Sequence, residues 1–198
     1  MKRCALTGNI GSGKSFIAQI ISEMGYPVYC ADNAAKQLLA TKNILAKLSK
    51  RFGESVIQKD GTPDKKLIAS IIFNDNEALA YLNSIIHPLV LKDFLLWEKQ
   101  QEGTIVFMEA ALIFEAGFEK YFDIVAVIDC PEELAIKRTI KRDNTTEKEV
   151  RLRMKHQLNR ATLLSKAGFI INNNEKSLLL PQILNLINKL TLNEFAKN

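Results

Sequence analysis

The sequence predicts an α/β fold in which helices cover both faces of a mainly parallel sheet. Two near-continuous apolar runs, "TIVFMEAALIF" at 104–114 and "DIVAVIDC" at 123–130, are typical of strands buried on both faces. Segments with helical periodicity alternate with the strand candidates, as in a parallel sheet with helical crossovers. A glycine-rich loop joins the first strand candidate to the first helix. Ligands bind such sheets at the carboxyl ends of the strands, so we expect the functional residues there.

The other elements follow from local patterns along the chain. Further strands are expected at 3–7, 27–31 and 168–172, and helices at 15–25, 32–51, 131–142 and 146–166, with a turn-rich break at 58–64. A last amphipathic helix carries Leu180, Ile183, Ile187 and Leu190 on one side. The helical stretch from about 33 to 100 is too long for a simple crossover. We therefore expect a single domain over 1–198 that includes a helical lobe at about 33–100.

Composition limits the class of protein. Hydrophobic residues make up 47% of the chain and charged residues 25%, which is typical of a globular protein and excludes a disordered one. The three cysteines, Cys4, Cys30 and Cys130, are odd in number and widely spaced, which favours reduced, buried thiols over a zinc site. We expect no membrane span, and no secretory segment before the strand that begins near Met1. Together these features predict a cytoplasmic protein.

Positive charge is concentrated in one stretch. Residues 137–166 carry a net charge of +7, which leaves −2 for the rest of a chain whose total is +5. A basic stripe of this kind occurs in nucleic-acid-binding proteins and also in a lid that closes over a polyphosphate. No aromatic residue interrupts this stretch, so it lacks stacking platforms for bases. The glycine loop decides between these two interpretations in favour of the lid.

The segment Gly8–Ser15, "GNIGSGKS", matches the pattern G-x-x-x-x-G-K-[ST] without a mismatch, with a strand before it and a helix after it. The glycines let the backbone curl so that its N–H groups point inward as a nest for phosphate at a helix N-terminus. Lys14 is placed to reach the β- and γ-phosphates of ATP, and the Ser15 hydroxyl to bind Mg²⁺. A glycine-rich turn that only caps a helix is the ordinary alternative. The expected contacts to nucleotide are Gly8, Asn9, Ile10, Gly11, Ser12, Gly13, Lys14, Ser15 and the backbone of Phe16.

This motif predicts the three-layer α/β/α fold of P-loop NTPases with a basic helical lid at about 137–166. A GTPase would need an N-K-x-D motif, which the sequence lacks. Glu109, at the end of a predicted strand, is a possible remnant of the acid that motor and transporter ATPases carry. A short chain with a basic lid favours a kinase of a small metabolite, which acts by positioning two substrates and neutralising charge.

The chain resembles the dephospho-CoA kinases. The resemblance runs from residue 4 to about 173 and rests on blocks in the family's order and spacing: "LTGNIGSGKS", "ADNAAKQLL", "LNSIIHPLVLKD", "EAALIFEAGFEKYFDIVAVIDCPEELAIKRTIKRDN" and "EVRLRMKHQLNRATLLSKAGFIINN". It implies transfer of phosphate from ATP–Mg²⁺ to the ribose 3′-hydroxyl of dephospho-CoA, the last step of coenzyme A synthesis. A nucleoside monophosphate kinase or another small-metabolite kinase is the alternative, and an ATP-responsive nucleic-acid-binding module is a remote one. We expect no nucleic-acid or membrane partner, and the sequence gives no oligomeric state.

The resemblance also implies roles for residues outside the loop, each with a structural alternative. Asp32 is expected to accept or orient the acceptor's hydroxyl proton, or to cap a helix, and the two roles are compatible. His87 is expected near the acceptor, although His87-Pro88 could simply end a helix. Glu115 could orient a ligand or a lid arginine.

Two basic residues and one amide complete the expected site. Arg138 and Arg142 lie four residues apart on one helix face and could grip the β- and γ-phosphates, or could simply be solvated. Arg153, Gln157 and Arg160 could extend this surface. Asn172 and Asn173, at the end of the last strand, could border the adenine.

Several positions depart from the family's common pattern. Asn9 replaces a glycine, which we expect to be tolerated because Asn adopts positive φ more easily than other non-glycine residues. Phe16 stands where Thr is usual, so a hydroxyl contact to the α-phosphate is lost. The other departures are Ala111 for proline, Ala135 for glutamine and Gly168 for aspartate.

Overall fold

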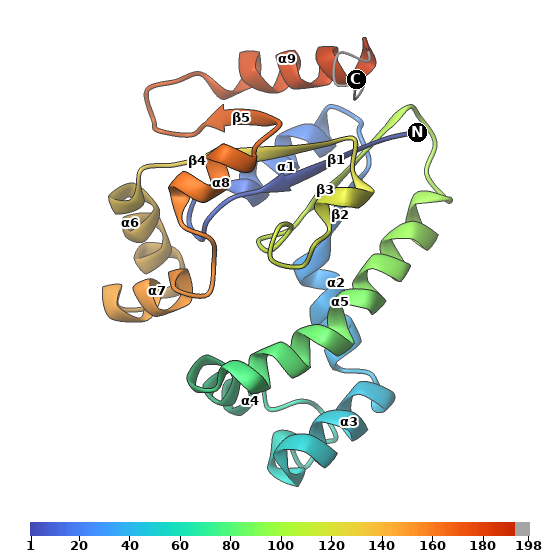
Figure 1. Ribbon diagram of the computed structural model, residues 1–198, viewed down its shortest axis with the longest axis vertical. Coiled ribbons are helices and arrows are strands. Elements are labelled where there is room, and N and C mark those ends of the chain that lie inside the picture. The colour runs from blue at the N-terminus through green and yellow to red at the C-terminus, as the bar shows by residue number, and fades with distance from the viewer. Residues whose placement is uncertain (193–198) are drawn as a thin grey trace. The chain divides into compact units, whose positions relative to one another are not determined.

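The computed structural model describes residues 1–192 (Figure 1). The chain divides into two compact units. The first combines Met1–Cys30 with the described residues from Gln100 onward, and the second is Ala31–Lys99. Each is described by itself.

The first unit contains a parallel sheet. Its strands within residues 1–192 are β1 (Lys2–Thr7), β2 (Val28–Cys30), β3 (Ile105–Glu109), β4 (Ile124–Asp129) and β5 (Phe169–Asn172). The strand order is β2-β3-β1-β4-β5, and every neighbouring pair is parallel. In this register Cys4 of the central strand β1 lies opposite Phe107 and Ile124. The predicted α/β fold with a parallel sheet is confirmed, and the strands are where the apolar runs predicted them.

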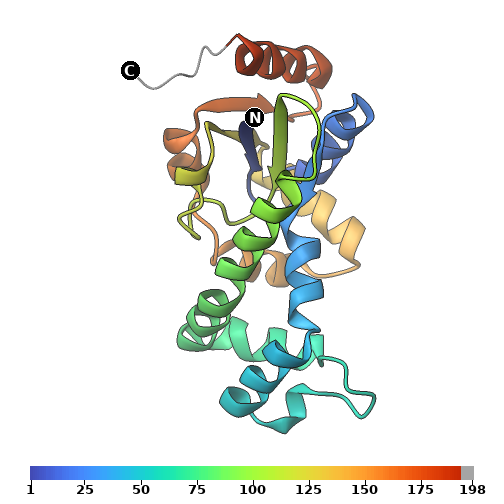
Figure 2. The ribbon, with the colours of Figure 1, turned by 90° about the vertical axis from the view of Figure 1, so that its right-hand side faces the viewer.

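Helices cover both faces of this sheet. On one face, α1 (Lys14–Glu23) and α9 (Leu179–Thr191) pack against each other and against the strands. The other face carries α8 (Arg160–Lys166), which packs on β4, as Figures 1 and 2 show in two orthogonal views. The core on the α1–α9 side is built from alternate strand residues and inward helix residues: Cys4, Leu6, Ile17, Ala18, Ile21, Ile105, Phe107, Ile124, Ala126, Ile128, Ile171, Ile183, Leu186, Ile187 and Leu190. This period of two along each strand, with both faces covered, explains why the strands read as continuous apolar runs.

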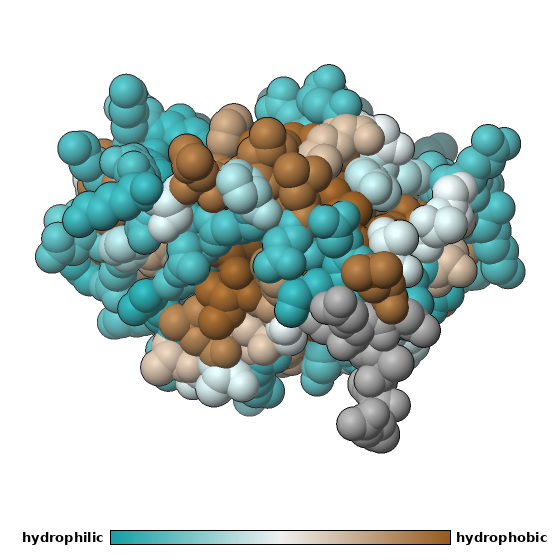
Figure 3. Space-filling view, turned by 90° about the horizontal axis from the view of Figure 1, so that it is seen from above, coloured by the Kyte–Doolittle hydropathy of each residue, from teal (hydrophilic) through white to brown (hydrophobic). Residues whose placement is uncertain are grey.

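The amphipathic face of α9 is shifted from the predicted one. Ile183, Ile187 and Leu190 are buried as expected, but Leu180 is 52% exposed and Leu186 takes its place in the core. Leu179, in the same turn, packs against the core, whereas Leu180 and Leu184, four residues apart, lie on an exposed side of the helix. Figure 3 looks down on α9 and shows apolar side chains at the surface there, and Leu178, Leu180 and Leu184 are among the exposed ones.

The predicted helix 146–166 is two helices, so this expectation is wrong. Helix α7 (Glu147–Met154) begins with a capping box between Thr146 and Glu149, and α8 begins at Arg160 with Asn159 as its N-cap. The five residues between them end α7 with i→i+3 hydrogen bonds, from His156 N–H to Arg153 O and from Gln157 N–H to Met154 O. Before them, α6 (Glu132–Asp143) matches the predicted helix at 131–142.

The second unit is helical. It contains α2 (Ala31–Leu39), α3 (Lys42–Phe52), the short 3₁₀ helix η1 (Glu54–Val56), α4 (Lys65–Asn74) and α5 (Asn76–Glu98). A second 3₁₀ helix, η2 (Glu119–Tyr121), belongs to the first unit. The single helix predicted at 32–51 is wrong, because the chain turns at Ala40 and Thr41, whose N–H groups bond to Gln37 O and Leu38 O. Thr41 then takes an extended conformation and starts α3.

Helix α5 runs through His87 and Pro88, so the alternative that this pair ends a helix is excluded. The Asp75 carboxylate caps its start by accepting hydrogen bonds from Glu77 N–H and Ala78 N–H. Packing of α5 against α2 and α4 outweighs the lost proline hydrogen bond. By length and composition alone α5 is also long and apolar enough to cross a membrane, which the sequence analysis did not expect; a single such helix is weak evidence for a span.

Candidate active site

The Gly8–Ser15 loop lies between β1 and α1, at the carboxyl end of the central strand. Gly13 is left-handed, with φ 92° and ψ 21°, directly before α1. Gly11, at φ +76°, lies so close to α6 that a Cβ there would overlap the carbonyl oxygen of Ala135. A Cβ on Gly13 would likewise overlap the Asn173 amide. The glycine spacing therefore serves both backbone curvature and close packing, as the motif predicts.

The Lys14 side chain lies along the loop. Its Nζ donates hydrogen bonds to Gly8 O, at 2.9 Å, and Asn9 O, at 3.3 Å, and the residue is only 8% exposed. These carbonyls hold the ammonium group against the loop that the motif predicts to be a phosphate nest. A positive charge held there is the arrangement that binds phosphate oxygens.

Ser15 lies beside two side chains from neighbouring strands. Its Oγ donates to Glu109 Oε1 at 3.2 Å, and the Cys30 thiol donates to Glu109 Oε2 at 3.3 Å. Glu109 ends β3 and is 4% exposed. Because parallel strands end at the same edge, β3 carries this acid to the loop that follows β1. A hydroxyl and a carboxylate oxygen side by side are ligands that Mg²⁺ prefers.

Asn173 and Arg138 pack against the other side of the loop. Asn173 is buried, its Nδ2 donates to Ser12 O at 2.7 Å, and its own N–H donates to Asp129 O at 2.8 Å. Arg138 Nη1 donates to Asn173 O at 3.3 Å, and Arg138 Nη2 pairs with Glu175 at 3.1 Å. The sequence analysis expected Asn173 to border the adenine, and the structure shows that its side-chain amide ties β5 to the loop.

The basic stretch is largely paired with carboxylates. Arg142 binds both carboxylate oxygens of Asp143, which also contacts Arg153 at 2.9 Å. The Arg142 hydrogen bond lowers the pKa of Asp143, and the same bond raises the pKa of Arg142. The other arginines of 137–166 also contact acids, in the pairs Arg138–Glu175, Arg151–Glu132, Arg151–Glu147 and Arg160–Asp129. Neighbouring acids thus offset much of the charge that the sequence concentrates here.

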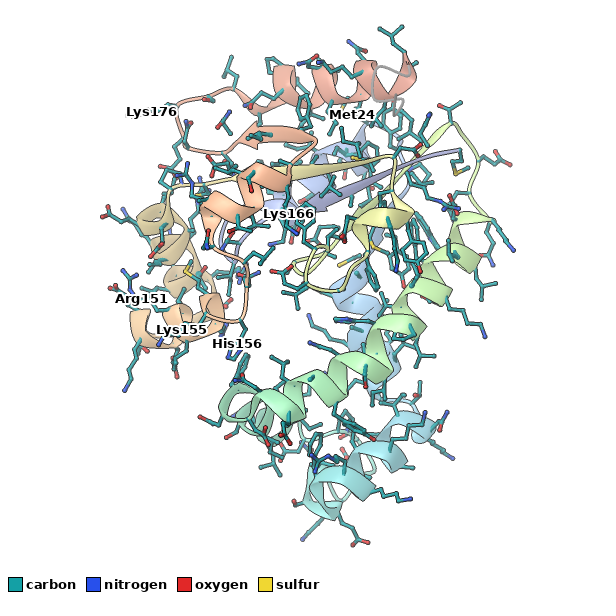
Figure 4. All side chains as sticks on the ribbon, viewed as in Figure 1. Met24, Arg151, Lys155, His156, Lys166 and Lys176 are labelled. Atoms are coloured by element: carbon teal, nitrogen blue, oxygen red, sulfur yellow. The ribbon has the colours of Figure 1, made fainter. Side chains whose placement is uncertain are left out.

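Figure 4 shows Arg151, Lys155 and His156 close together at the end of α7, with Lys166 farther along at the end of α8. Lys166 Nζ lies 5.5 Å from the ring centroid of Phe114, in the segment after β3. The same segment contains Glu115, whose Oε1 accepts a hydrogen bond from Leu158 N–H at 2.8 Å. The Glu115 carboxylate therefore binds a backbone N–H of the linker between α7 and α8.

Asn9 does not adopt positive φ, so the reason given for its tolerance is wrong. Its side chain instead donates from Nδ2 to Leu158 O at 3.1 Å. The next residue donates its backbone N–H to the side chain of Gln157, with 2.9 Å between Ile10 N and Gln157 Oε1. The tip of the loop is thus joined to the α7–α8 linker, which sequence patterns do not predict.

The other departures are accommodated locally. Gly168 lies where a Cβ would come 2.7 Å from Ile124 Cγ1, so an aspartate would need that side chain to move. Ala135 is buried on α6 beside Gly11, and Ala111 O accepts a hydrogen bond from Gln157 Nε2 at 3.4 Å. Phe16 is 57% exposed on the first turn of α1.

Two predicted site residues belong to the second unit. Asp32 is the second residue of α2 and is exposed, so it does not cap the helix, which begins at Ala31. As an acid in the first turn it still has a favourable interaction with the helix dipole. His87 is half-buried in the middle of α5, and this burial lowers its pKa.

A cavity of about 580 Å³ lies between the loop, the end of β4 and helices α6 to α8. Its lining includes Asn9, Ser12, Asp129, Ala135, Gln157 and Arg160. In residues 1–192 no cluster of three or more His, Cys, Asp or Glu could hold a metal by itself.

Comparison with known proteins identifies the family. A family model described as dephospho-CoA kinase matches residues 3–178. The chain belongs to the dephospho-CoA kinase family. A dephospho-CoA kinase of Bacteroides fragilis is 34% identical over 187 residues, which cover 93% of this chain and 91% of the relative.

Solved structures agree with the family assignment. The crystal structure of TT1252 from Thermus thermophilus has a TM-score of 0.82 and 28% identity and covers 99% of this chain and 98% of that one. The dephospho-CoA kinase from Campylobacter jejuni has a TM-score of 0.68 and 27% identity, over 98% of this chain and 100% of that one. The predicted family and P-loop kinase fold are confirmed.

Proposed function

We propose that this chain transfers the γ-phosphoryl group of ATP to the ribose 3′-hydroxyl of dephospho-CoA and releases ADP and coenzyme A. Membership of the dephospho-CoA kinase family carries this proposal. The local geometry supports it, because a curled glycine loop, a buried lysine and a serine–carboxylate pair lie at one strand edge.

The loop and Lys14 would hold the donor. Backbone N–H groups of the loop donate to phosphate oxygens, and Lys14 Nζ exchanges its carbonyl partners Gly8 and Asn9 for the β- and γ-phosphates. Gly11 and Gly13 keep the loop against α6 and Asn173, so the nest is preorganised. Such positioning supplies much of the catalysis in phosphoryl transfer.

Ser15 and Glu109 fit a magnesium site. The Ser15 hydroxyl would bind the ion, and the Glu109 carboxylate would orient that hydroxyl or a metal-bound water. Mg²⁺ bound there with ATP would neutralise charge on the phosphates. The acceptor hydroxyl and the transferred phosphoryl group are those of the two substrates.

The helical unit Ala31–Lys99 would bind the acceptor, through Asp32 and His87. Asp32 would accept the hydrogen bond of the 3′-hydroxyl and orient its oxygen toward the γ-phosphorus. As the new P–O bond forms, the bond from the γ-phosphorus to the β–γ bridging oxygen breaks, and the hydroxyl proton passes to the carboxylate or to water. An aspartate is a weak base, so orientation contributes more than proton removal.

Arg138 and Arg142 would stabilise the phosphates from the basic helices. Arg138 already lies close to Gly13, and Arg142 would exchange Asp143 for a phosphate oxygen as the part of the predicted lid before Gln157 moves. An arginine presented in this way stabilises charge on the transferred phosphoryl group. Glu115 would position the lid through Leu158.

A coupled ADP-release assay tests the acceptor. We expect turnover with dephospho-CoA and none above background with AMP, CMP, dTMP, shikimate or gluconate. Turnover with one of these and none with dephospho-CoA would replace the proposed acceptor. Salt-dependent binding of RNA or DNA without phosphotransfer would favour the nucleic-acid module instead.

A further inference from the structure

The linker between α7 and α8 accepts two hydrogen bonds from the tip of the phosphate loop. Ile10 N–H donates to Gln157 Oε1 at 2.9 Å, and Asn9 Nδ2 donates to Leu158 O at 3.1 Å. These two bonds join residues almost 150 positions apart in the sequence, with separations of 147 and 149. The contact lies wholly within the first unit.

The same linker is also bonded to the segment that follows β3. Leu158 N–H donates to Glu115 Oε1 at 2.8 Å, and Gln157 Nε2 donates to Ala111 O at 3.4 Å. The Gln157 carboxamide therefore uses both ends, its oxygen on the loop and its nitrogen on the 111–115 segment. A planar amide held from two sides has a fixed orientation.

The C-terminal side of the linker is anchored as well. Arg160 Nε and Nη2 bind both oxygens of Asp129 at 2.6 and 2.7 Å, at the end of β4. Helix α8 packs on β4. The predicted lid of 137–166 thus includes a part, from Gln157 onward, that is attached to the sheet, so movement of a lid would be confined to the part before it.

Gln157 occupies one N–H group of the phosphate loop. A backbone N–H has a single hydrogen, and that of Ile10 is donated to Gln157 Oε1 at 2.9 Å. In this arrangement Ile10 therefore fixes the position of the loop tip and makes no contact with phosphate. The Ser12 N–H is likewise occupied, because it donates to Asn9 O at 3.1 Å, so the tip of the loop is held from inside and from the linker. The direction in which the other N–H groups of the loop point depends on how the tip is held.

We propose that Gln157 is a positioning residue for phosphoryl transfer, which fixes the tip of the phosphate loop through Ile10. The inference rests on the proposed kinase function. Asn9 supports the same tip from its side chain, which the family's usual glycine could not do. Misplacement of a phosphate by about 1 Å can cost about 10²-fold in rate, so a loosened tip lowers turnover more than ATP affinity.

The test is the Gln157→Ala variant, with Asn159→Ala as the matched control. Asn159 lies two residues beyond Gln157 and caps α8 by accepting a hydrogen bond from Thr162 N–H at 2.9 Å. We expect Gln157→Ala to lower kcat about tenfold or more, with the dissociation constant of a non-hydrolysable ATP analogue changed less than about threefold. Asn159→Ala lowers the melting temperature of the full chain and leaves both kcat and the dissociation constant of the ATP analogue near their wild-type values.

Hydrogen exchange of the Ile10 amide reads the contact directly, without acceptor. Exchange should accelerate about tenfold or more in Gln157→Ala and remain slow in Gln157→Glu, whose carboxylate still accepts from Ile10 N–H. Unchanged exchange in Gln157→Ala, an unchanged kcat, or an equal loss of kcat in Asn159→Ala would overturn the proposal. If wild type turns over another acceptor, kcat is measured with that acceptor, and the proposed function fails separately from this inference.

Discussion

The Ser15 hydroxyl donates to the Glu109 carboxylate across 3.2 Å, although 94 residues separate them in the sequence. Glu109 is buried at the end of β3 and also accepts from the Cys30 thiol, so its carboxylate faces two donors. A buried acid beside the proposed metal-binding hydroxyl points to a role in holding Mg²⁺ with ATP.

Glu109→Gln should raise the Mg²⁺ concentration needed for half-maximal turnover about tenfold, because the amide keeps the shape and loses the charge. The measurement is initial rate against free Mg²⁺ at saturating ATP. Cys30→Ala is the control, since it removes only the thiol donor and should leave the Mg²⁺ dependence near that of wild type. Equal Mg²⁺ curves for Glu109→Gln and wild type would remove Glu109 from the metal site.

Asp32→Asn should lower kcat about 10²-fold while the dissociation constant of ATP stays within about threefold. Asn keeps the size of the side chain and cannot take up the hydroxyl proton. Single-turnover rates with dephospho-CoA, together with titration of an ATP analogue, separate the two effects. A kcat equal to that of wild type would leave Asp32 with only its interaction with the α2 dipole.

Gly11→Ala should unfold at a lower temperature than Gly25→Ala. Both glycines have positive φ, at +76° and +88°, so the backbone strain of about 1 kcal/mol is matched. A Cβ at Gly11 would overlap Ala135 O, whereas nothing lies within 4 Å of one at Gly25. Thermal unfolding followed by circular dichroism measures the difference. Equal melting temperatures would mean that α6 can move away from the loop without cost.

Acid should destabilise the protein in part through His87. Burial lowers its pKa in the folded state, so the unfolded chain binds the proton more readily. Stability is therefore full above the unfolded value of about 6.5 and falls as pH drops below it, by at most about 1.4 kcal/mol per pH unit. Urea unfolding between pH 7.5 and 5 should show a smaller loss in His87→Gln than in wild type. If the free energy of unfolding falls equally with pH in His87→Gln and in wild type, groups other than His87 cause the loss.

The sequence predicted the features that depend on local patterns. Continuous apolar runs located β3 and β4, and the spacing of Gly8 to Ser15 located the loop with its strand and helix. The fold class followed from these, and the family followed from the resemblance of the five sequence blocks. The functional roles of Asp32, His87, Arg138 and Arg142 remain predictions, and Asp32→Asn tests that of Asp32.

What the sequence did not predict depends on contacts between distant segments. The sequence pattern predicts one continuous helix at 146–166. The structure has a break there, where Gln157 accepts a hydrogen bond from the loop and donates one to Ala111, and Leu158 donates one to Glu115. The pairing of Glu109 with Ser15 needs the strand order β3-β1, which one sequence does not reveal. Pro88 lies inside α5 because packing within the helical unit outweighs a local signal.

The identity of the product tests the central claim most directly. Purified protein is incubated with ATP, Mg²⁺ and dephospho-CoA, and the product is analysed by mass spectrometry and compared with authentic coenzyme A. We predict one added phosphoryl group at the ribose 3′-position, and a rate about 10²-fold or more lower in Lys14→Ala, which loses the ammonium held by Gly8 and Asn9. No coenzyme A from the wild-type protein, or equal formation by Lys14→Ala, would contradict the account.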